Sequence, residues 1–410
     1  MLTKQRRDQL YTAFIVLIIF LIPSNLFLKL NYSGAYVNGL LVDYLIPKIY
    51  LNDIFIFTLL VLWLIEVVLV KKNKLKTTIF KPYFSSILIS LIIIRQIFAP
   101  YPLSAAWYLL KLIEVGLLGW FLAIHKKLLR KPIISYAIIA ASWFQSLLAI
   151  FQFFTQKSLL SYKFLGEPQL SNSIGLAKDV WWNTGRVLPY STTAHPNILG
   201  GILAIFSLIL ISWFSKAQNK WIQKLTIFTI LLAIFAIILT QSISAGLTLI
   251  IGSIFITAKK LNQKLLVIGG IILFIITPIF IHFSSQELTQ NDSLIRRSYL
   301  QTAAINMFVN NPILGVGLNQ FTSRVEEYSN TQEIVRFVQP VHHVGLLWLA
   351  ETGLLGLGIL AWIIVKNKLK KIIIPLLILL PLATLDHYLL TQQAGLLLMT
   401  LTIVWFQQKE

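Results

Sequence analysis

The sequence contains no cysteine and few charged residues. Among its 410 residues, cysteine is absent and only 12% are Asp, Glu, Lys or Arg. The lack of cysteine excludes disulfide bonds and thiolate metal sites, but it does not decide the compartment because helices packed in a membrane need no disulfides. The hydrophobic fraction is 57% and the mean hydropathy is +0.76. These values are typical of a membrane protein.

Long apolar runs divide the chain, and several are long enough to cross a bilayer. The run from Leu265 to Ile281 contains no charge, and a helix needs ~20 apolar residues to cross ~30 Å of hydrocarbon. We expect residues 1–410 to form one all-α transmembrane domain with about twelve helices. The predicted spans are 9–28, 52–70, 82–99, 103–124, 133–154, 197–214, 225–241, 242–258, 265–283, 343–365, 372–388 and 391–407. No small-x-small cleavage site follows the first run, which predicts an uncleaved first helix.

Acidic residues are scarce as well, since the chain has 15 of them against 35 Lys and Arg, a net charge of +20. In a soluble protein this excess of positive charge would suggest binding to nucleic acid. In a membrane protein it instead indicates that the lysine-rich loops lie in the cytoplasm. All lysine clusters fall on the same side of the membrane if the short polar link near Gln241 and Ser244 separates two spans. That layout places both termini in the cytoplasm and predicts no nucleic-acid partner. The clusters are 71–76, 126–131, 216–224, 259–264 and 366–371.

Two long polar loops, at about 155–196 and 284–342, lie on the opposite, lysine-poor side of this layout. Loops of such length in a compact protein are usually functional or disordered. Their aromatic residues argue against disorder, because they suit surfaces that contact lipid head groups or sugar rings. No internal repeat, low-complexity tract or soluble domain is evident. We therefore expect any chemistry to take place on the extracytoplasmic face.

The first long loop ends in a candidate anion site. Arg186 precedes His195-Pro196-Asn197, and Pro and Asn suit the start of a helix, where free N–H groups and the dipole favour an anion. A phosphate there would also meet the guanidinium group. The alternative is that Arg186 is an arginine at the membrane interface. His195 is better explained as a turn residue than as a catalyst.

The second long loop carries Arg296 and Arg297, which oppose the charge bias of that side. Their partners are either lipid phosphates or a ligand. Residues 294–309 can form a helix that ends at Asn311-Pro312. Gly315 and Gly317 follow, and they would permit a tight turn or a close approach to a ligand. A Gly-x-Gly pair alone is not a dinucleotide motif.

His342 and His343 lie where the second loop enters a span. Histidine accepts a proton near neutral pH, as a general base must. We predict no metal, because adjacent histidines on a helix point about 100° apart and no acidic or cysteine cluster accompanies them. Glu351 lies about two turns deeper, where a charge is expensive. Two further pairs are Lys111 with Glu114, which we expect to pair within the bilayer, and Asp386 with His387, which lie at a helix end where solvent makes them less informative.

These three segments, in this order, resemble the O-antigen ligase and O-antigen polymerase family of the bacterial envelope. The resemblance covers roughly residues 100 to 360. It rests on Arg186 before His195-Pro196-Asn197, on Arg297 fifteen residues before Pro312 with Ile313-Leu314-Gly315-Val316-Gly317, and on His342 ahead of Leu349-Ala350-Glu351-Thr352-Gly353.

The resemblance implies transfer of a glycan from an undecaprenyl-pyrophosphate carrier to a sugar hydroxyl of a glycan or glycolipid acceptor. The reaction would take place at the outer face of the cytoplasmic membrane, without a metal or cofactor. Arg186 and Arg297, with Arg296 beside it, would bind the pyrophosphate, and His342 would act on the acceptor. Members of the family often have Asn after this histidine, whereas this chain has His343, so both histidines remain candidates for the base.

Three other functions stay open at this stage. A polymerase of the same family would use the same donor with a different acceptor. A transporter or flippase of lipid-linked glycans would use Lys111, Glu114 and Glu351 as coupling charges, although such a protein should concentrate its charges at the bilayer midplane. A non-catalytic scaffold would leave the arginines and histidines of the loops without a purpose.

Overall fold

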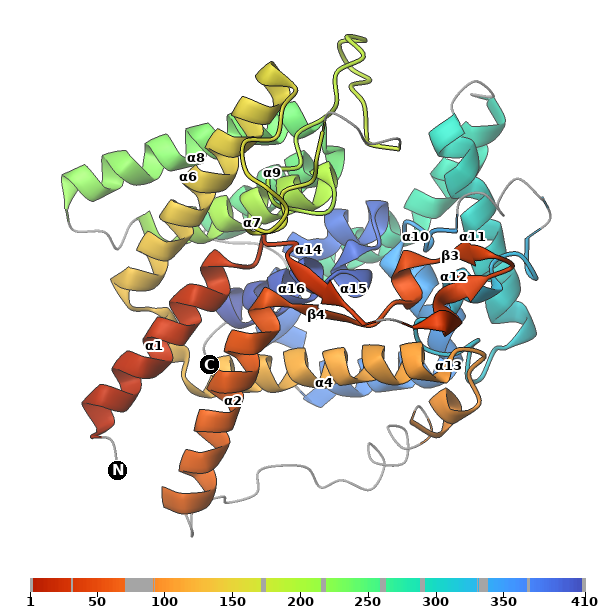
Figure 1. The fold of residues 1–410 in the computed structure, drawn as a ribbon, viewed down its shortest axis with the longest axis horizontal. Helices are drawn as coiled ribbons and strands as arrows, with labels where there is room; N and C mark the ends of the chain where they lie inside the picture. The colour runs from red at the N-terminus through yellow and green to blue at the C-terminus, as the bar shows by residue number, and fades with distance from the viewer. Residues whose placement is uncertain are drawn as a thin grey trace.

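The computed structural model describes residues 3–30, 32–70, 91, 93–170, 175–214, 219–258, 263–287, 292–329, 331, 338–366 and 369–407. Helices dominate, as predicted (Figure 1). They are α1 (Lys4–Phe20), α2 (Leu51–Val70), α4 (Pro102–Ile124), α5 (Lys126–Leu129), α6 (Pro132–Thr155), α7 (Pro196–Phe214), α8 (Lys220–Thr240), α9 (Ile243–Thr257), α10 (Gln263–Glu287), α11 (Asp292–Asn310), α12 (Phe321–Arg324), α13 (Val344–Lys366), α14 (Leu369–Leu385), α15 (Tyr388–Thr391) and α16 (Gln393–Phe406).

Within the described residues, 6 helices are long and apolar enough to cross a membrane: α2, α4, α6, α7, α8 and α13. Four shorter apolar helices lie at Ile243–Thr257, Leu265–Ile281, Lys371–Leu385 and Gln393–Phe406. The predicted span 82–99 falls mainly outside the described residues, and so does the lysine cluster 71–76. The protein is thus a helical membrane protein, and the count of twelve spans stays a prediction.

The predicted break between the seventh and eighth spans is confirmed. Gln241 adopts a left-handed conformation (φ 55°) and ends α8, after which the Ser242 hydroxyl accepts a hydrogen bond from the Ala245 N–H at 3.4 Å and caps α9. A left-handed residue followed by an N-cap serine is a common way to end one helix and begin the next. The short polar link at this point therefore turns the chain.

Helix α7 occupies the centre of the bundle. It packs against α6, α8, α9 and α16, and 78% of its residues are buried. Gly200 and Gly201 permit this close packing, because a Cβ on Gly201 would lie 1.9 Å from the Tyr388 hydroxyl. The N-terminal end of α7 carries the His195-Pro196-Asn197 motif, so the central position of α7 surrounds this motif with other helices.

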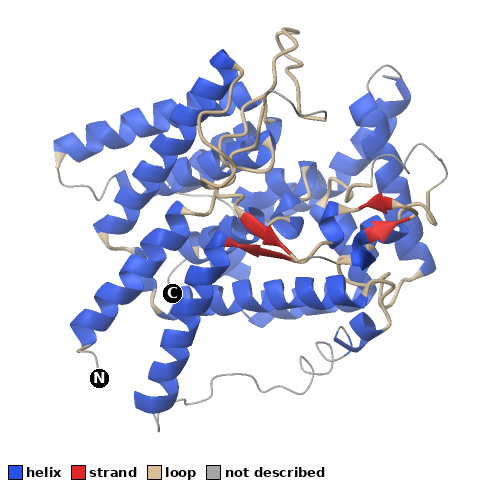
Figure 2. Cartoon of the chain, in the orientation of Figure 1, coloured by secondary structure: helices blue, strands red, loops and turns tan. Residues whose placement is uncertain are grey.

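Two pairs of short strands were not predicted from the sequence. Strands β1 (Phe27–Lys29) and β4 (Lys48–Tyr50) pair antiparallel, as do β2 (Tyr36–Val37) and β3 (Leu40–Leu41). The link between β2 and β3 is Asn38-Gly39, with φ of 48° and 81°, which is the preferred sequence of a tight hairpin turn. Figure 2 shows that these strands lie among the helices rather than forming a separate layer.

The two ends of the chain lie at the same end of the bundle. Lys131 donates to the Asp8 carbonyl near the start of α1 at 3.4 Å, and Lys126 donates to the Gln407 carbonyl just after α16 at 2.7 Å. Both lysines belong to one predicted cytoplasmic cluster. His195, Arg297 and His342 lie elsewhere, near the N-terminal ends of α7, α11 and α13.

Candidate functional site

A cluster of two histidines and one aspartate forms where three helices end. His342 lies just before α13, while Asp386 and His387 lie between α14 and α15. The rings of His342 and His387 are 4.9 Å apart between centroids and nearly perpendicular, at 70°. One ligand atom from each of the three side chains lies within 4.8 Å of the others. Asp386 and His387 are 5% and 6% exposed, so the expectation that solvent surrounds them is wrong.

The Nδ1 atom of His342 is the most notable atom of this cluster. It is buried and has no hydrogen-bond partner within the described part of the chain. A buried polar atom without a partner costs about 1–3 kcal/mol of desolvation. Native proteins rarely keep such an atom without a reason, and a ligand or substrate group is one reason.

Hydrogen bonds hold Asp386 and His387 in place. The backbone N–H of His387 donates to Asp386 Oδ1 at 2.7 Å, and the Asn197 amide at the start of α7 donates to Oδ2 at 2.9 Å. His387 Nδ1 lies 2.7 Å from the Thr391 hydroxyl. The Asp386 carboxylate thereby links the start of α7 to the segment between α14 and α15.

Arg297 brings a positive charge to the same place from α11. Its charge acts on His342, His387 and Asp386. The side chain is partly buried, and its guanidinium makes no hydrogen bond or ion pair with a described residue. Burial lowers the pKa of Arg297, although Asp386 opposes the effect. A partly buried guanidinium with free N–H groups is suited to a phosphate or carboxylate ligand.

The cluster's electrostatics favour neutral histidines beside an ionised carboxylate. Burial, then the charges of His387 and Arg297, lower the pKa of His342 well below its ordinary value. Burial also lowers the pKa of His387, to about 4. Burial alone would raise the pKa of Asp386, but His387 and His342 lower it to about 2. At neutral pH, His342 is therefore able to accept a proton.

His343 has a different environment. Its Nδ1 accepts the Leu346 N–H at 3.1 Å and so caps the first turn of α13, while Nε2 lies 3.1 Å from the Phe274 carbonyl. Nδ1 accepts, so Nε2 must carry the proton and donate it to that carbonyl. The imidazole is 2% exposed and also packs on the Phe274 ring. Both nitrogens of His343 are thus occupied, which favours His342 as the reactive one.

The remaining loop arginines take different positions. Arg186 stacks on Phe153 at 5.8 Å and donates to the Phe153 carbonyl at 3.4 Å. It shares an apolar groove with Trp182 and Phe235, among others, and no described contact joins it to the histidine cluster. Arg296 precedes Arg297 on α11, where one residue turns a side chain by ~100°. The structure therefore separates arginines that the sequence placed in one site.

His195 is held as a turn residue at the start of α7. Its Nδ1 accepts the Asn197 N–H at 3.2 Å, and its carbonyl accepts the N–H groups of Ile198 and Leu199. The charge of His195 also reaches Asp386 and His342. His195 thus borders the cluster while it caps a helix.

The glycine loop after α11 supports the site without entering it. The helix of residues 294–309 is confirmed as α11, and Gly315 (φ 63°) allows the following turn to reach α13. There the Glu351 carboxylate accepts the N–H groups of Asn319 at 2.9 Å and Phe321 at 3.1 Å. Glu351 is therefore a structural group that fastens this loop to α13.

Lys111 and Glu114 form the predicted pair, at 3.2 Å, and Asp53 of α2 is a second partner of Lys111. Gln393 in turn donates to Asp53 at 2.6 Å. These charges tie α2, α4 and α16 together. Such a closed network has no evident role in moving a substrate.

The donor atoms of His342, Asp386 and His387 are close enough to hold a metal ion, and two histidines with one carboxylate are a known ligand set. Two observations oppose this use. Both oxygens of Asp386 already accept hydrogen bonds, and the charge of Arg297 repels a cation. The cluster fits an anion with a proton acceptor better than it fits a metal.

Asp386 and His387 are the site residues that sequence reasoning undervalued. The available signal was an adjacent acid and histidine between two apolar runs on the predicted outer side. Their burial depends on how α14 and α15 pack against α7 and α13, which one chain's hydropathy pattern does not reveal.

Comparison with known families gives one match. Residues 228–361 match the family model described as O-antigen ligase. This region contains Arg297, His342 and Glu351, and it excludes Arg186, Asn197 and Asp386. No curated protein matches the chain.

Proposed function

We propose that this chain, whose residues 228–361 match the O-antigen ligase family model, transfers a glycan from undecaprenyl pyrophosphate to a sugar hydroxyl. The acceptor is a glycan or glycolipid, and the reaction takes place at the outer face of the cytoplasmic membrane. The observation that carries the proposal is the unpartnered Nδ1 of His342, which lies within the electrostatic reach of Arg297.

In this mechanism, His342 is the general base. The acceptor hydroxyl gives its proton to a ring nitrogen of His342 while its oxygen attacks the anomeric carbon of the donor glycan. The bond between that carbon and the carrier's phosphate oxygen breaks, and the electron pair leaves with the pyrophosphate. A positioned base typically contributes ~10²–10⁴-fold to the rate. The lowered pKa of His342 keeps its nitrogen free to accept at neutral pH.

Arg297 stabilises the leaving group. Negative charge grows on the pyrophosphate as the bond breaks, and a cation already in place stabilises that charge without reorganisation. The guanidinium has no described hydrogen-bond partner, so its N–H groups are available to phosphate oxygens. This arrangement supports a reaction in which arginine replaces the divalent metal.

Asp386 stabilises the protonated state of His342 that follows proton transfer. Its carboxylate is ionised, and its charge raises the pKa of His342. The amide of Asn197 and the backbone N–H of His387 fix its two oxygens. Asp386 is therefore assigned a positioning and electrostatic role.

Arg186 is assigned to the membrane surface. Its apolar groove includes Phe153, Phe154 and Trp182, and aromatic residues of this kind gather where a membrane meets water. A carrier lipid, with an apolar tail and a phosphate head, suits a groove that ends in an arginine. Arg186 then attracts the carrier, and Arg297 acts on it during the reaction.

The proposal also covers a polymerase, since a polymerase differs only in the acceptor. A transporter has less support. The charges that it would use at the midplane are engaged in fixed contacts, Lys111 with Asp53 and Glu351 with backbone N–H groups.

The test is a reconstituted transfer reaction. Purified protein is incubated with an undecaprenyl-pyrophosphate-linked oligosaccharide and a panel of lipid-anchored and soluble glycan acceptors, and the products are identified by mass. We expect a product that carries the donor glycan, with release of the carrier pyrophosphate and no loss of rate in EDTA. Loss of activity in EDTA with recovery on adding a metal would assign the cluster to a metal instead. No product with any acceptor would refute the transferase.

A further inference from the structure

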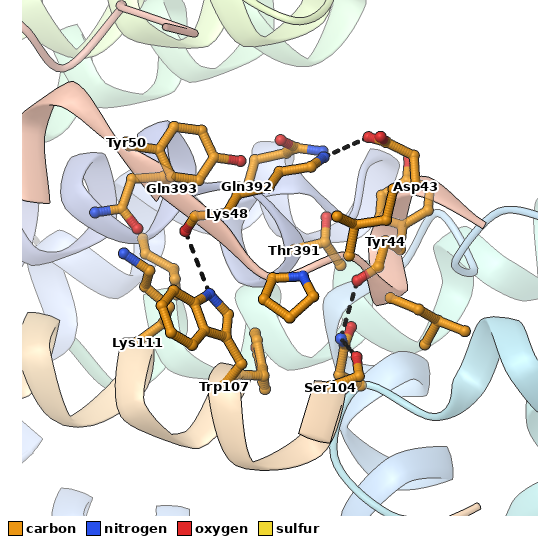
Figure 3. A pocket seen from close by; sticks show the side chains of 16 residues that line it. Asp43, Tyr44, Lys48, Tyr50, Ser104, Trp107, Lys111, Thr391, Gln392 and Gln393 are labelled. Atoms are coloured by element: carbon orange, nitrogen blue, oxygen red, sulfur yellow. Dashed lines mark hydrogen bonds and ion pairs between the residues drawn. The ribbon is translucent and has the colours of Figure 1, made fainter. Parts of the chain in front are cut away.

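A pocket beside the histidine cluster has the lining of a carbohydrate site. Sixteen residues surround it (Figure 3). They come from the segment that runs from η2 (Asp43–Leu45) through β4, from α4, from the end of α15 and the start of α16, and from the loop that contains Asn319. The cavity is about 60 Å³ and is open on one side. One water needs ~10–15 Å³ of such space, so the cavity holds only a few water-sized groups, and a single sugar ring fits by extending into the open mouth. Apart from Asn319, this lining lies outside the region that matches the O-antigen ligase family.

The pocket lining combines aromatic rings with polar side chains. Trp107 stands in its wall, and its indole N–H donates to the Lys48 carbonyl at 3.2 Å, which fixes the ring between α4 and β4. Tyr44, Tyr50 and Tyr108 also line the space. A flat ring offers an apolar face to the C–H groups of a pyranose, while amides and hydroxyls bind its hydroxyl groups.

Each charged side chain that lines the pocket has an oppositely charged partner. Lys48 binds Asp43, and Lys111 binds Asp53. An anionic ligand would find no unpaired cation, and a cationic ligand would find no unpaired carboxylate. The pocket therefore suits a neutral polar molecule.

Two polar groups of the lining are available to such a molecule. The Tyr50 hydroxyl and the Gln392 side-chain amide make no hydrogen bond with a described residue, and Gln392 is partly exposed. Other polar groups are engaged, for instance the Ser104 hydroxyl, which accepts the Asn319 amide at 2.7 Å. A sugar hydroxyl is both donor and acceptor, so it is able to bind a phenol and an amide at once.

The pocket adjoins the reactive cluster on its histidine side. Thr391 lines the pocket and is bonded to His387 Nδ1 at 2.7 Å. Tyr44 lines it as well, and its ring lies edge-on to His387 at 5.7 Å between centroids. The acceptor hydroxyl must approach the base, whereas the donor's phosphates must approach Arg297. Because the ring of His387 lies 4.9 Å from that of His342 between centroids, a sugar in this pocket is near the base and so on the acceptor's side.

We propose that this pocket binds one neutral pyranose ring of the acceptor glycan, with Trp107 as its apolar wall and Tyr50 and Gln392 as hydrogen-bonding groups. That the bound sugar is the acceptor rests on the proposed function, whereas the binding of a neutral sugar does not. It also assigns acceptor selection to segments that precede and follow the family domain, which would allow one transfer mechanism to serve different sugars.

The first experiment measures binding alone. Neutral methyl pyranosides of several configurations, and the matching methyl uronides, are added to the purified His342→Ala protein, and contact is detected by saturation-transfer NMR. We expect at least one neutral pyranoside to bind, and Tyr50→Phe and Gln392→Ala in the same background to weaken it roughly 3- to 10-fold each, as the loss of one hydrogen bond predicts. Tyr36→Phe is the matched control, because Tyr36 is 54% exposed on β2 and does not line the pocket.

Binding that these variants leave unchanged, or stronger binding of the uronides, would overturn the proposal. The second experiment measures transfer activity in protein that retains His342. There Tyr50→Phe and Gln392→Ala should raise the KM for the acceptor while the KM for the donor and kcat change less than twofold. A raised donor KM would place the donor's sugar in the pocket instead. Pyranoside binding without any transfer would refute the proposed function but would still support the sugar-binding site.

Discussion

At the residue scale, the two candidate cations on the outer loops differ in what surrounds them. Arg297 has a guanidinium without described partners beside Asp386, whereas Arg186 is stacked on Phe153. One charge-assisted hydrogen bond to a phosphate contributes ~1.5–3 kcal/mol. The motifs predict the same role for both arginines, because a one-dimensional motif does not report which of them reaches the reacting atoms.

We therefore expect Arg297→Ala to lower kcat at least tenfold, while Arg186→Ala mainly raises the KM for the carrier-linked donor. Arg297→Lys should restore part of the rate, because an ammonium lacks the bidentate fork of a guanidinium. Steady-state kinetics with the carrier-linked oligosaccharide would measure both effects. Equal losses in kcat for the two alanine variants would show that Arg186 also acts at the reacting centre.

The pH profile follows from the environment of His342. The base acts only when its ring is neutral, and its pKa is lowered from 6.5 by burial, by His387 and by Arg297. The rate should therefore stay constant as the pH falls from 7.5 to 6.5 and should decline only in more acid solution. Asp386 raises this pKa, so Asp386→Asn should move the decline to still lower pH. A decline of kcat/KM centred at or above pH 6.5 would contradict the assignment of a buried base.

At the scale of the elements, most of the fold was predictable from the sequence and most of the site was not. Hydropathy located the long helices, and Asn311-Pro312 correctly marked the end of α11. Charge counting correctly divided α8 from α9. The strands around Asn38-Gly39 were missed because an apolar pattern dominates that region. The meeting of His342 with Asp386 depends on packing between α13, α14 and α7, and no local pattern records it.

The loop after α11 depends on one glycine. Gly315 has φ of 63°, and a Cβ there would lie 2.3 Å from the carbonyl carbon of Glu351. Gly315→Ala should thus lower the unfolding temperature more than Gly39→Ala does. Gly39 also has a positive φ, of 81°, but nothing lies within 4 Å of its added Cβ, so its variant reports only the ~1–2 kcal/mol of backbone strain. The unfolding temperatures of the two variants are compared in detergent. Equal decreases in unfolding temperature would mean that the contact between Gly315 and α13 is not tight.

At the scale of the whole molecule, orientation in the membrane decides whether the site faces the carrier's glycan. The chain has no cysteine, so single cysteines can be introduced without background. Val180→Cys, at a position 78% exposed, and Glu327→Cys should react with an impermeant maleimide in intact spheroplasts. Lys127→Cys, in a lysine cluster, should react only after the membrane is opened. Labelling of Lys127→Cys from outside would invert the orientation and exclude a site on the outer face.

The most direct test of the central claim compares the two adjacent histidines in a single-turnover transfer reaction. Protein preloaded with carrier-linked oligosaccharide is mixed with acceptor, and the product is followed over time. Since His342 has a free buried nitrogen and His343 has both nitrogens occupied, His342→Ala should slow transfer ~10²–10⁴-fold with donor binding nearly unchanged. His343→Ala should lower thermal stability and slow transfer less than tenfold. Near-normal transfer by His342→Ala, or the reverse order of the two variants, would contradict the account.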